Sequence, residues 1–246
     1  MSTRHAAFQR PQAATLAERL VEPRRFLQVV AGPRQVGKST LVQQVTDQLG
    51  VPVRYVIDTH YHADHSWGSC FFPNATVIAH TLCRTKLATI GQASLQETRK
   101  QNPAFRRVRI ILPHLTFDES YLLLRVGKKT LSMFPLPGPC DDNIGILVEE
   151  DRVLFAGDAF MPLPYIVGGN IDDLTNSLKK ISKMGLENVV PGHGDIVLRG
   201  EIDGFIKDNL AYLSNIRKVV RRANKRKYPQ EVLDEANVES CGKSRV

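Results

Sequence analysis

The chain has 246 residues and a mass of 27.5 kDa, and 42% of its residues are hydrophobic and 24% are charged. This balance is typical of a globular protein of one large or two small domains, and it excludes a disordered or collagen-like chain. No apolar run approaches the roughly 18 residues that a membrane span needs. Residues 1–20 contain no apolar core of a signal peptide, so we expect a cytoplasmic protein with no membrane partner.

The net charge of +8 is concentrated near the two ends of the chain. Residues 1–50 and residues 217–227 each contain seven basic residues, and the rest of the chain is slightly acidic. A basic run is more often a solvated helix face than a nucleic-acid site, so we expect no nucleic-acid partner. The four cysteines form no CxxC pair, so neither a disulfide framework nor a cysteine zinc site is expected. They are Cys70, Cys83, Cys140 and Cys241.

The first predicted elements are a buried strand at residues 26–31 (FLQVVA), a glycine loop, and a helix that ends at Gly50. The loop matches the pattern GxxxxGK[ST]. In such a loop, backbone N–H groups surround a phosphate, the lysine reaches its β and γ oxygens, and the serine holds Mg²⁺ at the helix N-terminus. The residues predicted to contact a nucleotide are Gly32, Gly37, Lys38, Ser39 and Thr40.

With a strand before the loop and a helix after it, residues 15–50 resemble the opening of P-loop ATPases of the AAA-like class. This resemblance implies ATP and Mg²⁺ as ligands. A full P-loop domain also needs a parallel sheet and a second acidic residue for Mg²⁺. The only apolar run ending in an aspartate that could mimic this acidic strand is RVLFAGD at residues 152–158, which a second motif explains better. We therefore expect a truncated ATPase fragment, with nucleotide binding as an alternative.

Residues 51–57 predict a strand, and the pattern HxHxDH follows its end. His60 and His62 are two positions apart, so on an extended segment they point the same way and can bind one metal ion. Asp64 and His65 follow where the chain turns into a helix, so they can face a second metal ion. Imidazole and carboxylate ligands suit Zn²⁺, with Mn²⁺ or Fe as alternatives.

Two later motifs complete the pattern, namely an apolar strand that ends in Gly-Asp158 and the segment Gly-His193-Gly. Over about residues 51–215, the chain resembles the metallo-β-lactamase superfamily of hydrolases. The metal ligands that this resemblance implies are His60, His62, Asp64, His65, Asp158 and His193, with Asp158 as the bridging carboxylate. It also implies an α+β fold, the αβ/βα sandwich, and a reaction on a small-molecule substrate. In that reaction metal-bound hydroxide, oriented by the catalytic residue Asp64, attacks an ester, thioester, lactone or lactam carbonyl.

The sequence departs from the family pattern at residues 137–143, which read PGPCDDN. The family places a histidine in the segment PGH[ST]xD, and Pro139 stands at that position. Cys140 or Asp141 would need a shift of the loop to replace the missing ligand, so we favour Cys140 as a small loop residue. We therefore expect one tightly bound metal ion and one weak or vacant site. The expected tight set is Asp64, His65, Asp158 and His193.

The rest of the sequence predicts an incomplete sandwich. Strands are expected at residues 53–57, 76–79, 108–111, 121–126, 130–134, 144–148, 152–156 and 188–190, and helices near residues 82–89, 172–184 and 201–226. The opening strands of the family's first sheet lack their usual sequence. Either the strand FLQVVA and the helix at residues 39–49 substitute for part of that sheet and its covering helix, or the sheet has an unpaired apolar edge that invites a homodimer or aggregation. We favour an altered, less stable sandwich. Asn143 and Tyr165 are candidate substrate contacts, with loop and wall roles as the alternatives.

These expectations divide the chain into a P-loop-like segment at residues 1–50, a hydrolase domain at residues 51–227 and a partly ordered tail at residues 228–246. The leading hypothesis is a metal-dependent hydrolase. The rival hypothesis is a nucleotide-binding or structural fusion protein whose hydrolase half is inactive because Pro139 and the missing strands disrupt the site.

Overall fold

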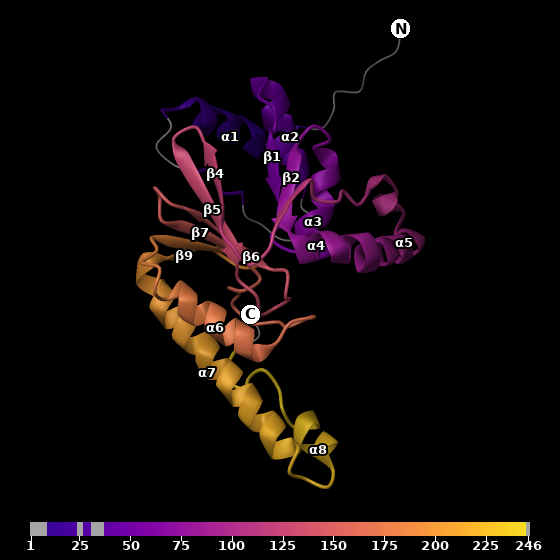
Figure 1. Cartoon of the computed structure of the whole chain (residues 1–246), viewed down its shortest axis with the longest axis vertical. Coiled ribbons are helices and arrows are strands. Elements are labelled where there is room, and N and C mark those ends of the chain that lie inside the picture. The colour runs from indigo at the N-terminus through magenta and orange to yellow at the C-terminus, as the bar shows by residue number, and fades with distance from the viewer. Residues whose placement is uncertain (1–8, 24–26, 31–36, 245–246) are drawn as a thin grey trace.

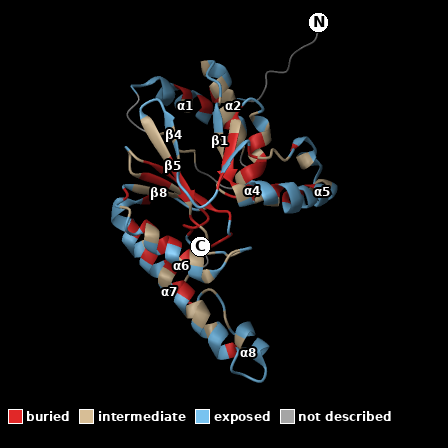
Figure 2. Cartoon of the chain, in the orientation of Figure 1, coloured by how far each residue is buried: buried red, intermediate tan, exposed pale blue. Residues whose placement is uncertain are grey.

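The computed structural model describes residues 9–23, 27–30 and 37–244. Two β-sheets pack against each other, with helices on their outer faces (Figure 1). Buried residues are concentrated in the strands, whereas α8 and the far end of α7 are largely exposed (Figure 2). The fold is therefore the expected α+β sandwich.

The first sheet contains three parallel strands in the order β1-β2-β3 within the described residues. They are β1 (Tyr55–Ile57), β2 (Thr76–His80) and β3 (Leu115–Phe117). The helical segments between them are α3 (Ala63–Ser66), η1 (Trp67–Phe71), α4 (Thr81–Lys86), η2 (Leu87–Gly91), α5 (Gln92–Gln101) and η3 (Pro103–Arg107). Helix α4 packs on β2 through the buried residues Ala79, Cys83 and Leu87.

The second sheet contains six strands in the order β4-β5-β6-β7-β8-β9. They are β4 (Leu122–Val126), β5 (Lys129–Pro135), β6 (Ile144–Val148), β7 (Val153–Gly157), β8 (Asn188–Pro191) and β9 (Val197–Leu198). All neighbours pair antiparallel except β7 and β8, which are parallel because α6 (Ile171–Ile181) crosses between them. The second sheet is covered by α6 and α7 (Arg199–Ala223).

Two hydrophobic clusters hold these layers together. Ile78 and Phe117 of the first sheet pack against Met133, Ile144 and Ile146 of the second sheet. The larger cluster lies between the second sheet and the helices α6 and α7. In the fully buried β6, Ile144 and Ile146 belong to the first cluster and Leu147 belongs to the larger one, because alternate side chains point to opposite sides of a sheet.

The N-terminal described residues form a helical hairpin of α1 (Gln12–Val21) and α2 (Lys38–Leu49). Its own cluster consists of Ala13, Ala17, Leu41 and Val45. The strand predicted at residues 26–31 is wrong for residues 27–30, which form no strand, and the remaining two positions lie outside the described residues. Val30 packs instead against the helical hairpin, which offers no strand edge for backbone pairing.

The strand predicted at residues 108–111 is also wrong. This apolar run is irregular: Val108 packs against Trp67 and Leu95, and Ile110 contacts the helical side of the first sheet. The third strand begins only after Pro113, because a proline has no N–H to donate to a ladder. His114 makes the first contact with β2, because its backbone N–H donates a 2.8 Å hydrogen bond to the Val77 carbonyl.

The segment after α7 folds back on the end of that helix. It contains α8 (Pro229–Asp234), and the Asn215 side chain donates a 3.1 Å hydrogen bond to the carbonyl of the buried Cys241. Among the described residues, no helix combines the length and the apolar character that a membrane crossing requires.

Candidate metal centre

The six predicted ligands meet where three strands end. His60, His62, Asp64 and His65 follow β1, while Asp158 directly follows β7 and His193 follows β8. Because β7 and β8 are parallel neighbours, their ends lie at the same edge of the second sheet. The packing of the two sheets brings that edge next to the end of β1. Two groups of side chains result, each with its ligand atoms within 4.8 Å of one another.

The first half-site consists of His60, His62 and Asp158. His60 Nε2 lies 2.9 Å from His62 Nδ1 and 3.5 Å from Asp158 Oδ2. His60 and Asp158 are buried, and His62 is half-buried. The structure brings the two histidines together, although residues 59–62 form a bend between β1 and α3 and not the predicted extended segment.

The second half-site consists of Asp64, His65 and His193. Asp64 Oδ2 lies 3.1 Å from Nε2 of both histidines, and the two Nε2 atoms are 3.2 Å apart. Asp158 Oδ1 lies 3.3 Å from His65 Nε2 and 3.6 Å from His193 Nε2. The Asp158 carboxylate thus lies between the half-sites, with one oxygen toward each.

The donor set fits divalent cations. Asp158 Oδ1 is buried and has no hydrogen-bond partner within the described structure, so it is an acceptor that a bound cation could satisfy. Imidazole nitrogens converge on the carboxylate oxygens from both sides, and nitrogen with oxygen is the ligand chemistry of zinc. Asp158, together with the two histidine pairs, would hold such ions.

The protonation states also suit metal ligands, which must be neutral imidazoles and ionised carboxylates. Burial lowers the pKa of His60, and burial together with the neighbouring His60 lowers the pKa of His62 to about 4. Burial alone would raise the pKa values of Asp64 and Asp158, but the adjacent histidines outweigh it and leave both below their usual values.

A sequence profile of the Metallo-beta-lactamase superfamily matches residues 39–193. The chain belongs to this superfamily. Among curated relatives, it is 24% identical over 171 residues to the Beta-lactamase-like protein 2 homolog of Caenorhabditis elegans, covering 69% of this chain and 52% of that protein. It is 23% identical over 151 residues to Thioesterase pkgB of Emericella nidulans, covering 60% and 36%. The chain therefore spans about half the length of the first relative and less of the second.

Solved structures show the same fold. The B3 metallo-β-lactamase BLEG-1 superposes with a TM-score of 0.55 at 23% identity, over 69% of this chain and 83% of that one. A double mutant of the sec-alkyl sulfatase PisA1 superposes with a TM-score of 0.63 at 13% identity, over 81% and 39%. At these identities the likeness establishes the superfamily fold and not a substrate.

Residues outside the metal-ligand motif position the ligands. The Thr59 hydroxyl lies 3.1 Å from His60 Nδ1 and 3.4 Å from His65 Nδ1, which turns the Nε2 atoms of both rings toward the centre. Gly157 has a φ of 53°, and Gly192 lies so close that a Cβ would meet Asp158 Oδ1 at 2.0 Å. Sequence reasoning missed Thr59, although its position directly before His60 was a usable signal.

Asp58 is a second residue that sequence reasoning missed. Its side chain is buried at the end of β1, and Oδ1 accepts a 2.7 Å hydrogen bond from the Ser69 hydroxyl. Burial raises the pKa of Asp58 to about 7, against the opposing effect of the Ser69 hydrogen bond. Its place directly before the motif was visible in the sequence, but its burial was not.

The two candidate substrate contacts differ in exposure. Asn143 is buried: its amide donates to the carbonyls of Leu136 and Ala156 at 2.9 and 3.2 Å, and its oxygen accepts from the Asp158 N–H. These hydrogen bonds favour the alternative role predicted for Asn143, in which it holds the loop and does not contact substrate. Tyr165 is 69% exposed.

A backbone hydrogen bond holds the loop around Pro139 in place. The Pro139 carbonyl accepts a 2.7 Å hydrogen bond from the N–H of Val167. Cys140 is fully buried, and burial together with the nearby Asp142 carboxylate raises the pKa of its thiol. Within the described structure, neither Cys140 nor Asp141 joins the two half-sites.

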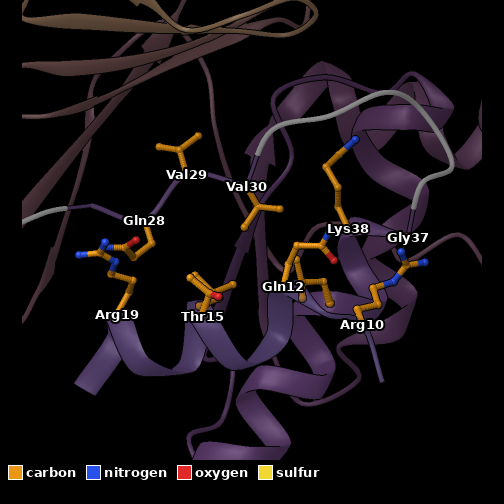
Figure 3. A pocket seen from close by; sticks show the side chains of 11 residues that line it. Arg10, Gln12, Thr15, Arg19, Gln28, Val29, Val30, Gly37 and Lys38 are labelled. Carbon is orange, nitrogen blue, oxygen red and sulfur yellow. The ribbon is translucent and has the colours of Figure 1, made fainter. Parts of the chain in front are cut away.

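The P-loop-like residues lie apart from this centre. Gly37, with a φ of 82°, and Lys38 line a cavity of about 520 Å³ at the N-terminus of α2 (Figure 3). Ser39 and Thr40 are not among the described residues that line this cavity, and Gly32 lies outside the described residues. The side chain of Ser39 is next to Gly68 of η1 instead.

Proposed function

We propose that the chain is a zinc-dependent hydrolase that cleaves an ester, thioester, lactone or lactam of a small molecule. The single observation that supports this most is the position of the Asp158 carboxylate between two histidine-containing half-sites. Membership of the superfamily supports hydrolysis as the reaction class. A thioesterase and a metallo-β-lactamase are among the similar proteins, and these two share a carbonyl substrate.

When bound, a divalent cation lowers the pKa of a coordinated water to about 7 and polarises a carbonyl oxygen. Asp64 is our candidate for orienting the attacking water, because its Oδ2 atom lies at the more exposed half-site between two imidazoles. Its lowered pKa makes its carboxylate a weak base, so orientation rather than proton storage is the role that fits it.

The test is a panel of chromogenic ester, thioester, lactone and lactam substrates with the zinc-loaded chain. We expect hydrolysis that a chelator abolishes and added zinc restores. Replacing Asp64 with alanine should reduce kcat by about 10²-fold or more. Asp203→Ala, at an exposed position of α7, is the matched control and should keep full activity. A folded chain that binds no zinc would contradict the proposal.

A second candidate function is the binding of a phosphate-bearing ligand such as ATP at the N-terminus of α2. The cavity there is lined by Arg10, Arg19 and Lys38, and none of the eleven described residues that line it is acidic. The Arg10 guanidinium lies against Gly37, and its Nε atom is buried without a hydrogen-bond partner. The N-terminus of α2 carries a partial positive charge, which repels the cationic side chains beside it. An anion in the cavity would relieve this repulsion.

Thermal denaturation with added ATP or inorganic phosphate tests this second candidate. We expect either anion to raise the melting temperature, and Lys38→Met to reduce that increase. Lys100→Met, at an exposed position of α5, is the control. An equal increase in both variants, or none in the unaltered chain, would refute binding at this cavity.

A further inference from the structure

The Asp142 carboxylate links the Pro139 loop to the first half-site. Its side chain is fully buried, and Oδ2 accepts a 2.8 Å hydrogen bond from the backbone N–H of Tyr61. Tyr61 stands between His60 and His62, so this hydrogen bond fixes the backbone that orients both imidazoles. The loop offers a proline where the superfamily has a histidine ligand, but it still acts on the histidine pair through Asp142.

Lys86 of α4 supplies a positive charge to Asp142. Its Nζ atom lies 3.2 Å from Asp142 Oδ1, bonds to Asp141 as well, and lies 4.8 Å from the centre of the Tyr61 ring. The Lys86 side chain is only 16% exposed. Lys86 therefore contacts both partners of the Tyr61–Asp142 hydrogen bond, namely the Asp142 carboxylate and the Tyr61 ring.

Two buried thiols also lie in this environment. Cys83 and Cys140 are fully buried, and burial together with the nearby Asp142 carboxylate raises the pKa of both thiols. Neutral thiols add no positive charge. Burying a carboxylate without a cation is costly, so Lys86, 3.2 Å from Asp142 Oδ1, is the side chain that stabilises this carboxylate.

We propose that Lys86 and Asp142 form a positioning pair that holds His60 and His62 in the geometry needed to bind a metal ion. The inference rests on the proposed metal-dependent function. It assigns the pair to the first half-site alone, because the hydrogen bond from Tyr61 lies between the two histidines of that half-site. The hydrogen bonds of Lys86 and Asp142 join them to Tyr61, to Asp141 and to each other.

The experiment is a zinc titration of the full chain followed by NMR of the histidine rings. The ring signals of His60 and His62 report the first half-site, and those of His65 and His193 report the second half-site in the same sample. In Lys86→Met we expect the zinc concentration for half-saturation of the first half-site to rise about 10- to 100-fold, as for other groups that support metal ligands. The zinc concentration for half-saturation of the second half-site should be the same as in the unaltered chain.

Two further variants separate positioning from general stability. Lys86→Arg keeps the cation and should recover most of the zinc affinity, while Lys100→Met should leave both midpoints unchanged. Thermal denaturation of each zinc-free variant reports its folding. If Lys86→Met does not fold, Asp142→Ala, which removes the acceptor for the Tyr61 N–H while Asp141 still pairs with Lys86, provides the test. A weakened first half-site in it supports the proposal, and an unchanged one contradicts it.

Three results would overturn the inference. Unchanged midpoints in Lys86→Met would show that the pair does not support the histidines. An equal loss at both half-sites that Lys86→Arg does not restore would show general destabilisation. A first half-site that never responds in the unaltered chain, while the second does, would leave the hydrolase proposal standing on one metal ion. A folded chain in which no ring responds would instead remove the proposed function itself.

Discussion

The two half-sites of the candidate metal centre differ in burial and in charge. In the first, the His60 side chain is fully buried and the only carboxylate is the shared Asp158. In the second, the side chains of Asp64 and His193 are 23% and 32% exposed, and Asp64 adds a carboxylate of its own. The first is a buried pair of neutral imidazoles, and the second is a more open site with an additional negative charge.

This difference assigns different roles to the two halves. A divalent cation gains more from an ionised carboxylate than from a neutral imidazole, so the second half-site should bind it more tightly. Its greater exposure also leaves room for a substrate and an attacking water. The first half-site depends on preorganisation by its surroundings, since its own ligands bring little charge.

The largest effect should come from removing one histidine from each half-site in turn. His193→Gln takes a ligand from the charged half-site and should weaken the tighter zinc equivalent by roughly 100-fold or more. His62→Gln should leave that equivalent intact and abolish the weaker one. Isothermal titration with zinc and elemental analysis after dialysis measure both effects. A loss of the tighter equivalent in His62→Gln would reverse the proposed ranking.

A smaller effect in the opposite direction should follow from restoring the missing ligand. Pro139→His places an imidazole at the position where the superfamily has its histidine, in a loop whose backbone is already held by the hydrogen bond to Val167. We expect the weaker zinc equivalent to tighten by about tenfold or more. Pro139→Ala is the matched control, since it removes the proline without adding a ligand. Equal affinities in the two variants would show that residue 139 does not face the first half-site.

The sequence predicts the parts of this comparison that depend on local spacing. The interval between His60 and His62 and the Gly-Asp158 turn after a strand identify residues that the structure brings together, because strand ends place such side chains at one edge. Whether these residues bind metal remains a prediction. The strand predicted at residues 144–148 has the same bounds in the structure, because these residues form an uninterrupted apolar run.

Long-range packing explains what the sequence did not predict. The alternating apolar residues at 108–111 satisfy a strand pattern, but they pack against helices, and Pro113 delays the strand to residue 115. Lys86 and Asp142 lie 56 positions apart and meet only because α4 packs near the Pro139 loop. No spacing rule connects such residues, so only the folded chain shows that Asp142 of this loop contacts both Lys86 and the backbone of Tyr61.

The smallest effect should come from Thr59, a side chain outside the ligand set that contacts a histidine of each half-site. Its hydroxyl lies near Nδ1 of His60 and of His65, and such a hydrogen bond fixes which ring nitrogen is left for a metal ion. Thr59→Val keeps the shape but removes the hydroxyl, so we expect about tenfold weaker zinc binding at both half-sites and about 1 kcal/mol less stability. Thr59→Ser keeps the hydroxyl and should restore the affinity. Because the distance to His60 is the shorter one, the first half-site should lose more, and a larger loss at the second would show that Thr59 orients His65 first.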